Sequence, residues 1–308
     1  MSLARICRWF GVTRQAYYQA CWRQEERSLE HQLVLNEVRR IRSDHKRMGT
    51  IKLHEKLEPI FMDLHIKMGR DGLNNLLRQH GMLIRNKRRK YITTNSLHRY
   101  KMYPNLIRDL KPTGANQIWV SDITYWKPKN TVYYISFITD LYSHKVVGYH
   151  IATTLEAEAS AKALKMALRE NPRRLRKDLI HHSDRGSQYC SDLYTKILKA
   201  QEIEISMTEN GDPLENAVAE RINGIIKGEY LFDKKPKNLT ESRTQLQIAI
   251  ELYNTDRPHL SIGNLYPAQL HASALERATI RMWKNYYKKR SDVNLKQEQN
   301  GSVNKNQE

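Results

Sequence analysis

Three acidic residues in the middle of the chain lie in segments where carboxylates could do chemistry. Asp122 lies inside an apolar strand-like segment, where an unpaired carboxylate is costly to bury. Asp184 ends a second strand-like segment, and Glu220 lies inside a helical segment, with thirty-five residues between the two. Carboxylates that converge in a fold repel one another unless hard cations neutralise them, and Mg²⁺ prefers carboxylate oxygens with water and phosphate. The three residues therefore predict a metal site.

A site of this kind can catalyse phosphoryl transfer. Two cations about 3.5–4 Å apart can activate a hydroxyl group and stabilise the leaving oxygen of an in-line displacement. We therefore expect Mg²⁺ or Mn²⁺ as the cofactor, with two ions per active site. Each acid taken alone also fits a surface charge or a helix cap. Only the combination of the three in these elements favours catalysis.

The segments around the acids have the pattern of an α/β domain. Strand-like segments over residues 117–126, 132–139 and 145–152 are joined by short turns, which favours an antiparallel meander. Helices are predicted over residues 155–170, 190–201, 217–228 and 240–254, and strands over residues 179–183 and 202–206. By fold-level analogy, this order predicts a ribonuclease-H-like mixed five-stranded sheet flanked by helices. In that arrangement the ends of the first and fourth strands are adjacent.

The composition excludes several classes of protein. Of the 308 residues, 40% are hydrophobic, which excludes a wholly disordered chain. No apolar segment approaches the roughly 20 residues that span a bilayer, so we expect no membrane partner. The N-terminal segment does not resemble a secretory signal. The three cysteines form no CxxC pair, which argues against a disulfide framework or a cysteine zinc site. We expect a cytoplasmic, nucleoid-associated protein.

The charge of the chain points to a polyanionic partner. There are 52 Lys and Arg against 33 Asp and Glu, a net charge of +19. Residues 1–110 carry 23 of the basic residues and 10 of the acidic ones, a net charge of +13. The densest basic run contains Arg85, Lys87, Arg88, Arg89 and Lys90. We expect this run to bind DNA, because each neutralised phosphate releases counterions; a solvated linker is the alternative.

The first third of the chain is predicted to be helical. Residues 3–10 are apolar at helical spacing, Gly11 interrupts them, and Thr13 can cap a second helix that begins at Arg14. This is the outline of a helix-turn-helix. Further helices are predicted over residues 29–42, 51–57, with Thr50 as the cap, and 69–79. They give a second helix-turn-helix candidate over about residues 45–92, and a helical bundle without a DNA role is the alternative.

Four sequence blocks resemble those of a known family. They are WVSDITY at residues 119–125, HHSDRGSQY at 181–189, NAVAE at 216–220 and YNTDRPH at 253–259. They resemble the blocks of the OrfB-type insertion-sequence transposases, which have a retroviral-integrase-like (rve) DDE catalytic core. The resemblance covers about residues 30–272, and the thirty-five-residue spacing is the family's own.

The resemblance implies roles for individual residues. Asp122, Asp184 and Glu220 would form the catalytic and metal-binding triad. Lys227 follows Glu220 by seven residues on the same helix face and is expected to contact a DNA phosphate. Asn216, one turn before Glu220, would orient the substrate or cap the helix.

The remaining polar residues of the blocks are expected to be structural. His181 and His182 would form hydrogen bonds, because hard Mg²⁺ prefers oxygen ligands. Arg257 and His259 would pack and form hydrogen bonds in the closing block.

The resemblance implies a DNA transposase, which cleaves transposon ends and joins them to target DNA by in-line phosphoryl transfer. This reaction is DNA integration and recombination. Because two ends must be joined, we expect a homo-oligomer on DNA, and a protein from an upstream reading frame is a further candidate partner. A nuclease on the same fold and a catalytically silent DNA-binding regulator derived from a transposase stay open as alternatives.

The expected domain organisation follows from these patterns. It comprises a helix-turn-helix-like segment (1–28), a helical DNA-binding module (29–92), a linker (93–115), the catalytic core (116–272) and a basic extension (273–308).

Overall fold

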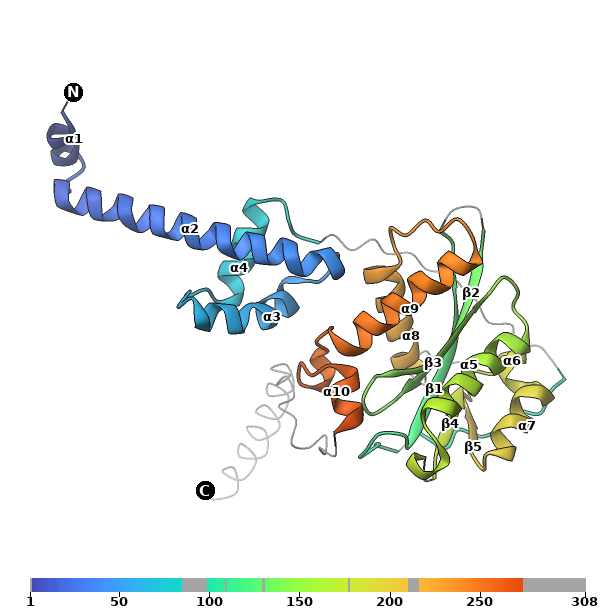
Figure 1. Cartoon of the computed structure of the whole chain (residues 1–308). Coiled ribbons are helices and arrows are strands. Elements are labelled where there is room, and N and C mark those ends of the chain that lie inside the picture. Colours follow the sequence, from blue (N-terminus) through green and yellow to red (C-terminus); the bar gives the residue numbers. More distant parts are fainter. Residues whose placement is uncertain are drawn as a thin grey trace, which may run out of the picture.

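The structure is a computed structural model that describes residues 2–84, 99–108, 110–128, 131–176, 178–209 and 216–273, without the side chains of residues 23–26 (Figure 1). Two predicted features lie outside the described residues. They are the basic run with Arg85, Lys87, Arg88, Arg89 and Lys90, and residues 274–308 of the basic extension.

A five-stranded mixed sheet forms the centre of the core, in the order β3-β2-β1-β4-β5. Its strands are β1 (Ile118–Trp126), β2 (Tyr133–Asp140), β3 (Val146–Ala152), β4 (Ile180–Ser183) and β5 (Glu204–Met207). The first three are antiparallel, whereas β4 pairs parallel to β1 and β5 pairs parallel to β4. The alternation of apolar residues along β1 and β2 places side chains on both faces, so both faces must be covered.

Helices cover the two faces of the sheet (Figure 1). They are α5 (Ala157–Glu170), α6 (Ser187–Cys190) and α7 (Asp192–Ala200) on one face, and α8 (Ala217–Ile225) and α9 (Leu239–Thr255) on the other. Helix α5 lies close against β3 at Gly148, where a Cβ atom would lie 2.4 Å from the carbonyl oxygen of Ala163. The predicted ribonuclease-H-like α/β sheet flanked by helices is confirmed, and so is the antiparallel meander that begins it.

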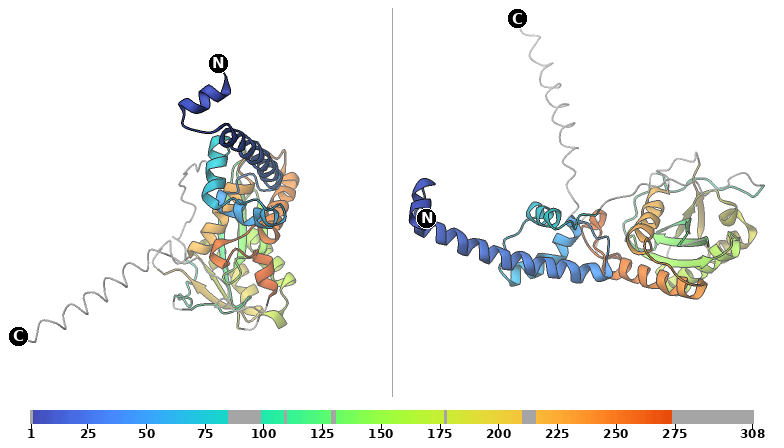
Figure 2. Two further views of the ribbon diagram at one scale, coloured as in Figure 1. Left: turned by 90° about the vertical axis from the view of Figure 1, so that its left-hand side faces the viewer. Right: turned by 90° about the horizontal axis from the view of Figure 1, so that it is seen from above.

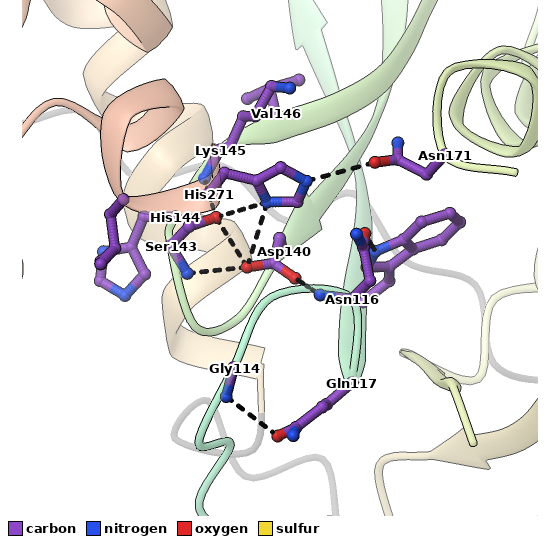
Figure 3. Close-up of polar contacts among 12 residues, drawn as sticks. Gly114, Asn116, Gln117, Asp140, Ser143, His144, Lys145, Val146, Asn171 and His271 are labelled. Carbon is purple, nitrogen blue, oxygen red and sulfur yellow. Dashed lines mark hydrogen bonds and ion pairs between the residues drawn. The ribbon is translucent and has the colours of Figure 1, made fainter. Parts of the chain in front are cut away.

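The last described helix, α10 (Pro267–Ala272), is fastened to the end of β2 by buried polar groups (Figure 3). Nδ1 of His271 lies 3.0 Å from Oγ of Ser143, which donates a 2.6 Å hydrogen bond to Asp140. Asp140 also accepts a hydrogen bond from the backbone N–H of Asn116, and Nε2 of His271 lies 3.2 Å from Oδ1 of Asn171. Because the carboxylate is fully buried but hydrogen-bonded, the network fixes this corner of the core.

The N-terminal region is helical, as predicted, and contains α1 (Leu3–Trp9), α2 (Arg14–Asp44), α3 (Thr50–Asp63) and α4 (Arg70–Gln79). Thr13 caps α2, since its Oγ1 accepts a 3.0 Å hydrogen bond from the N–H of Ala16. The prediction of a separate helix over 29–42 was wrong, because α2 is one continuous helix of 31 residues. Figure 2 shows its first half projecting from the molecule, with α1 at the far end.

The second half of α2 packs with α3 and α4 around an apolar core of its own. Val38, Leu53, Leu57, Leu73 and Leu77 are fully buried in it. We call residues 34–82, which contain this core, the helical module.

Two details of the helices in the module differ from the prediction. The cap of α3 is Gly49 rather than Thr50, whose hydroxyl donates to Oδ1 of Asn74 instead. Helix α3 also continues through Pro59 to Asp63, beyond its predicted end. No helix among the described residues is both long and apolar enough to cross a membrane.

Candidate active site

The pairing of β1 with β4 brings two of the three acids together. In the parallel register Ser121 lies opposite Ser183, so the residues that follow them, Asp122 and Asp184, are neighbours. Asp184 lies directly after the end of β4, where its Oδ1 accepts a 3.0 Å hydrogen bond from the N–H of Gly186. The first and fourth strands are therefore adjacent, as predicted, and this places Asp122 next to Asp184.

Helix α8 brings the third acid to the same place, because asparagines on either side of Glu220 bind β1. Nδ2 of Asn216 donates a 3.0 Å hydrogen bond to the carbonyl oxygen of Ser121. Nδ2 of Asn223 donates a 2.6 Å hydrogen bond to Oδ2 of Asp122. Residues three and four apart on a helix are neighbours on one face, so Glu220 lies between these two contacts. Asn216 occupies the position before the helix, but its side chain forms no capping hydrogen bond.

The pKa values of two of the acids are raised by burial and by neighbouring carboxylates. Burial, together with the charges of Asp184 and Glu220, raises the pKa of Asp122 to about 7. Burial also raises the pKa of Glu220, with a second contribution from Asp184. Asp122 and Glu220 are therefore harder to ionise than free carboxyl groups, in part because other carboxylates of the cluster are near.

The donor set of this cluster fits a hard divalent cation. It consists of carboxylate oxygens, which Mg²⁺ prefers, and their mutual repulsion would be relieved by positive charge. Within the described parts of the chain, no three His, Cys, Asp or Glu side chains already form a metal-coordinating group. The carboxylates therefore lie within electrostatic reach of one another without being in coordinating positions.

Lys227 faces the acidic cluster from the helix that carries Glu220. It lies in the π-helical turn η3 (Ile226–Tyr230), which continues α8 directly. Its Nζ lies 4.9 Å from the centroid of the Tyr125 ring on β1. Burial lowers the pKa of Lys227, and the charge of Asp122 partly offsets this effect.

The two motif histidines are buried beneath the site and bind neighbouring side chains. Nε2 of His181 lies 2.7 Å from Oγ of Ser121 and 2.9 Å from the hydroxyl of Tyr194. Burial lowers the pKa of His181 to about 3, so the ring is neutral at pH 7. Nδ1 of His182 lies 2.8 Å from Oγ of Ser206. The expectation that both histidines are structural agrees with these contacts.

The closing block also has the structural contacts that were expected. Arg257 is buried and donates two hydrogen bonds, of 2.8 and 2.7 Å, to the carboxylate of Glu229. The ring of His259 is buried against the rings of His144 and Tyr253.

Sequence reasoning missed two residues of the site, Asn223 and Tyr125. Asn223 follows Glu220 by three residues, so helical spacing alone would have placed it on the same face. Tyr125 follows Asp122 by three residues on a strand, where alternation sends side chains to opposite faces, so no sequence signal linked the two. The predicted DNA-binding run at residues 85–90 cannot be related to the site, because it lies outside the described residues.

Comparisons with known proteins agree with the arrangement of the core. Two family models, each described as "Integrase core domain", match residues 112–213 and 201–267. The "uncharacterized 31 kDa protein" of insertion element IS600 from Shigella sonnei is 35% identical over 265 residues, which cover 85% of this chain and 96% of that protein. The transposase InsF for insertion sequence IS3A from Escherichia coli (strain K12) is 29% identical over 279 residues, 87% of this chain and 93% of that protein.

Solved structures of retroviral integrases are more distant. The HTLV-2 integrase catalytic core domain in complex with magnesium (trimeric form) is 22% identical, with a TM-score of 0.42, and the match covers 51% of this chain and 97% of that chain. The family-model matches and the relative from IS600, which is similar over almost its whole length, show that the chain belongs to the insertion-sequence transposases with an integrase core domain and is a polynucleotidyl transferase that acts on DNA.

Proposed function

We propose that Asp122, Asp184 and Glu220 form the active site at which this transposase cleaves transposon ends and transfers them to target DNA. The observation that carries the proposal is the proximity of the three carboxylates, which come from β1, the end of β4 and α8. The charges of Asp184 and Glu220 contribute to the raised pKa of Asp122, and the charge of Asp184 contributes to the raised pKa of Glu220. Repulsive clusters of this kind are costly to stability, and perturbed pKa values gather at functional sites.

These three carboxylates would hold divalent cations, Mg²⁺ or Mn²⁺ and two per site. Bound cations would stabilise charge on the phosphoryl oxygens and lower the pKa of the attacking hydroxyl group. The chain itself has two further tasks at the site. Asn223 keeps the carboxylate of Asp122 in one orientation, and the ammonium group of Lys227 binds a phosphate of the DNA end.

The remaining parts of the chain would hold the DNA. We assign residues 29–92 to a DNA-binding module and residues 116–272 to the catalytic core, with the segment 1–28 in front, the linker 93–115 between them and the extension 273–308 behind. The basic run Arg85, Lys87, Arg88, Arg89 and Lys90 would bind phosphates in this scheme. Two transposon ends must be joined, so the active form would be a homo-oligomer on DNA, working on the nucleoid in the cytoplasm.

A strand-transfer assay tests the proposal. Labelled duplexes with the DNA ends that flank the coding frame are incubated with Mg²⁺ or Mn²⁺ and the wild-type protein, Glu220→Gln or Glu251→Gln. The last variant is a matched control, because Glu251 is an exposed carboxylate on α9, away from the site. We expect joined products from wild type and Glu251→Gln and none from Glu220→Gln, with DNA binding unchanged in all three.

Other outcomes would replace the proposal. Cleaved but unjoined ends from the wild type would indicate a nuclease. Joined products from Glu220→Gln would exclude this triad. DNA binding without any product would indicate a silent regulator if the protein of an upstream reading frame, once added, does not restore activity.

A further inference from the structure

Asp256 and Glu229 are two of the acidic core residues that the helical module contacts. Asp256 directly follows α9 within the YNTDRPH block, and Glu229 lies in the π-helical turn η3. Catalysis as proposed above gives no role to either residue. Each carboxylate forms a hydrogen bond or an ion pair with basic side chains of the module, so each joins the helical module to the core.

Asp256 binds two basic residues of the module. Its carboxylate accepts a hydrogen bond from the ammonium group of Lys56 and lies 2.7 Å from Nε2 of His45. The other nitrogen of His45, Nδ1, lies 3.0 Å from the hydroxyl of Tyr230, the last residue of η3. The side chain of His45 is only 2% exposed. Because both of its partners belong to the core, the ring is fixed from both sides.

Glu229 binds one residue of the module and one of the core. Arg257 clamps its carboxylate with two hydrogen bonds, and Nζ of Lys52 lies 3.5 Å from Oε1. The side chains of Arg257 and Lys52 are 2% and 17% exposed, so the charges are shielded from water. A shielded, bidentate arrangement fixes geometry far better than an exposed surface pair does.

The position of Glu229 in the chain links this contact to the active site. It follows Lys227 by two residues and Glu220 by nine, and all three lie on the continuous helix formed by α8 and η3. Residues two apart on a helix do not share a face. Lys227 therefore points to Tyr125 and Asp122 while Glu229 points to Lys52 and Arg257. Because both residues lie in the same helical turn, a displacement of Glu229 would also displace Lys227.

We propose that Lys52 and Glu229 are positioning residues for transposition. Docking of the helical module on Glu229 holds the π-helical turn in place, and this keeps Lys227 over Tyr125 beside the acidic cluster. The inference rests on the proposed function, because it assigns Lys227 a place in the reaction. Its consequence is that the module contributes to the rate of the chemical step, and not only to DNA affinity.

The experiment compares Lys52→Met with Lys46→Met in the full-length protein. Both substitutions remove one positive charge from the module side of the interface. Lys46, however, pairs with Asp233 in an exposed bridge of 2.5 Å, with the two side chains 49% and 30% exposed. Single-turnover cleavage is measured at saturating end DNA, and the Kd for the same DNA is measured separately. We expect Lys52→Met to cleave about tenfold more slowly with a Kd like that of Lys46→Met, which cleaves at the wild-type rate.

A double-mutant cycle shows whether Lys52 acts through Lys227. If it does, the double variant Lys52→Met/Lys227→Ala cleaves no more slowly than Lys227→Ala alone, because Lys52→Met can no longer displace the ammonium group of Lys227. Lys52→Arg, which keeps the ion pair, restores most of the rate. Thermal melting of each variant identifies any that fails to fold. Arg257 is left unchanged, because its loss would leave the Glu229 carboxylate shielded from water and without its two hydrogen bonds from Arg257.

Two results would overturn the inference. One is wild-type cleavage by a folded Lys52→Met, and the other is a double variant whose rate loss is the product of the two single losses. Failure of the proposed function has a different signature, namely cleavage by Glu220→Gln. Inactive Glu220→Gln together with fully active Lys52→Met would therefore remove only the positioning role.

Discussion

Asn223 donates a hydrogen bond of 2.6 Å from its Nδ2 to Oδ2 of Asp122, and this contact joins α8 to β1 at the acidic cluster. The second oxygen of Asp122 accepts a 2.9 Å hydrogen bond from the N–H of Ile123. The carboxylate is thus oriented by one donor on each oxygen. A hydrogen-bond donor that orients a carboxylate increases the affinity of the site for a cation, because the carboxylate does not have to be ordered when the cation binds.

Substituting Asn223 should therefore change the metal dependence of the reaction. We expect Asn223→Ala to cleave end DNA about 10–100-fold more slowly at a fixed low concentration of Mg²⁺, with part of the loss recovered as Mg²⁺ is raised. The measurement is an Mg²⁺ titration of the cleavage rate for both proteins. An identical midpoint for wild type and variant would show that the asparagine does not support the acidic site.

Replacing one acid should stabilise the metal-free protein, since the three carboxylates repel one another. Asp184→Asn keeps an acceptor for the N–H of Gly186 but removes a charge. In EDTA we expect its Tm to exceed that of wild type by about 2–4 °C for each kcal/mol of relieved repulsion. Mg²⁺ should raise the Tm of wild type by mass action and leave that of the variant almost unchanged. A variant that melts below wild type in EDTA would contradict the repulsive cluster.

The buried histidine of the closing block should make stability depend on pH. Burial, with help from the charges of His144 and Arg257, lowers the pKa of His259 to about 2. An unfolded histidine has a pKa of about 6.5, so between these two values the unfolded chain binds the additional proton. The contribution of the neutral ring is complete above pH 6.5 and is lost as the pH falls, by up to about 1.4 kcal/mol per pH unit.

Denaturant unfolding between pH 7.5 and pH 4.5 checks this dependence. His259→Asn should lose less free energy of unfolding over this range than wild type does, even if it is less stable at pH 7.5. His80→Asn serves as a control, because His80 is exposed at the end of α4. Parallel curves for wild type and His259→Asn would refute the prediction.

Two glycines should respond oppositely to alanine. At Gly148 a Cβ atom would lie 2.4 Å from the carbonyl oxygen of Ala163 and 2.8 Å from Cβ of Ala167, so α5 would have to move away from β3. We expect Gly148→Ala to lose about 1–3 kcal/mol of stability or more. Gly224 in α8 has no such neighbour within 4 Å, and Gly224→Ala should gain up to about 1 kcal/mol from helix propensity. Urea unfolding of the two variants provides the comparison, and equal effects would contradict the close packing at Gly148.

The sequence was most informative where local pattern and local structure coincide. The alternation along 117–126 predicted β1, and the hydroxyl of Thr13 predicted the start of α2. Asp122 was identifiable because a carboxylate in an apolar strand is costly. These signals depend on neighbours within a few residues, which a single sequence contains.

The features that were missed depend on contacts between distant residues. The unbroken course of α2 and the π-helical geometry of η3 have no local marker in the residue pattern. No residue pattern links His45 to its partners, Tyr230 and Asp256, which follow it by 185 and 211 residues. Contacts over such separations are set by the docking of one part of the chain on another, which periodicity does not describe.

The continuity of α2 also sets a length scale for any DNA complex. At about 1.5 Å per residue, its 31 residues span about 46 Å. One turn of B-DNA is about 34–36 Å. The helix therefore separates α1 from the core-facing end of α2 by more than a full turn of the double helix. In a complex in which both α1 and the carboxylates contact DNA, as proposed above, they would contact distinct stretches of it.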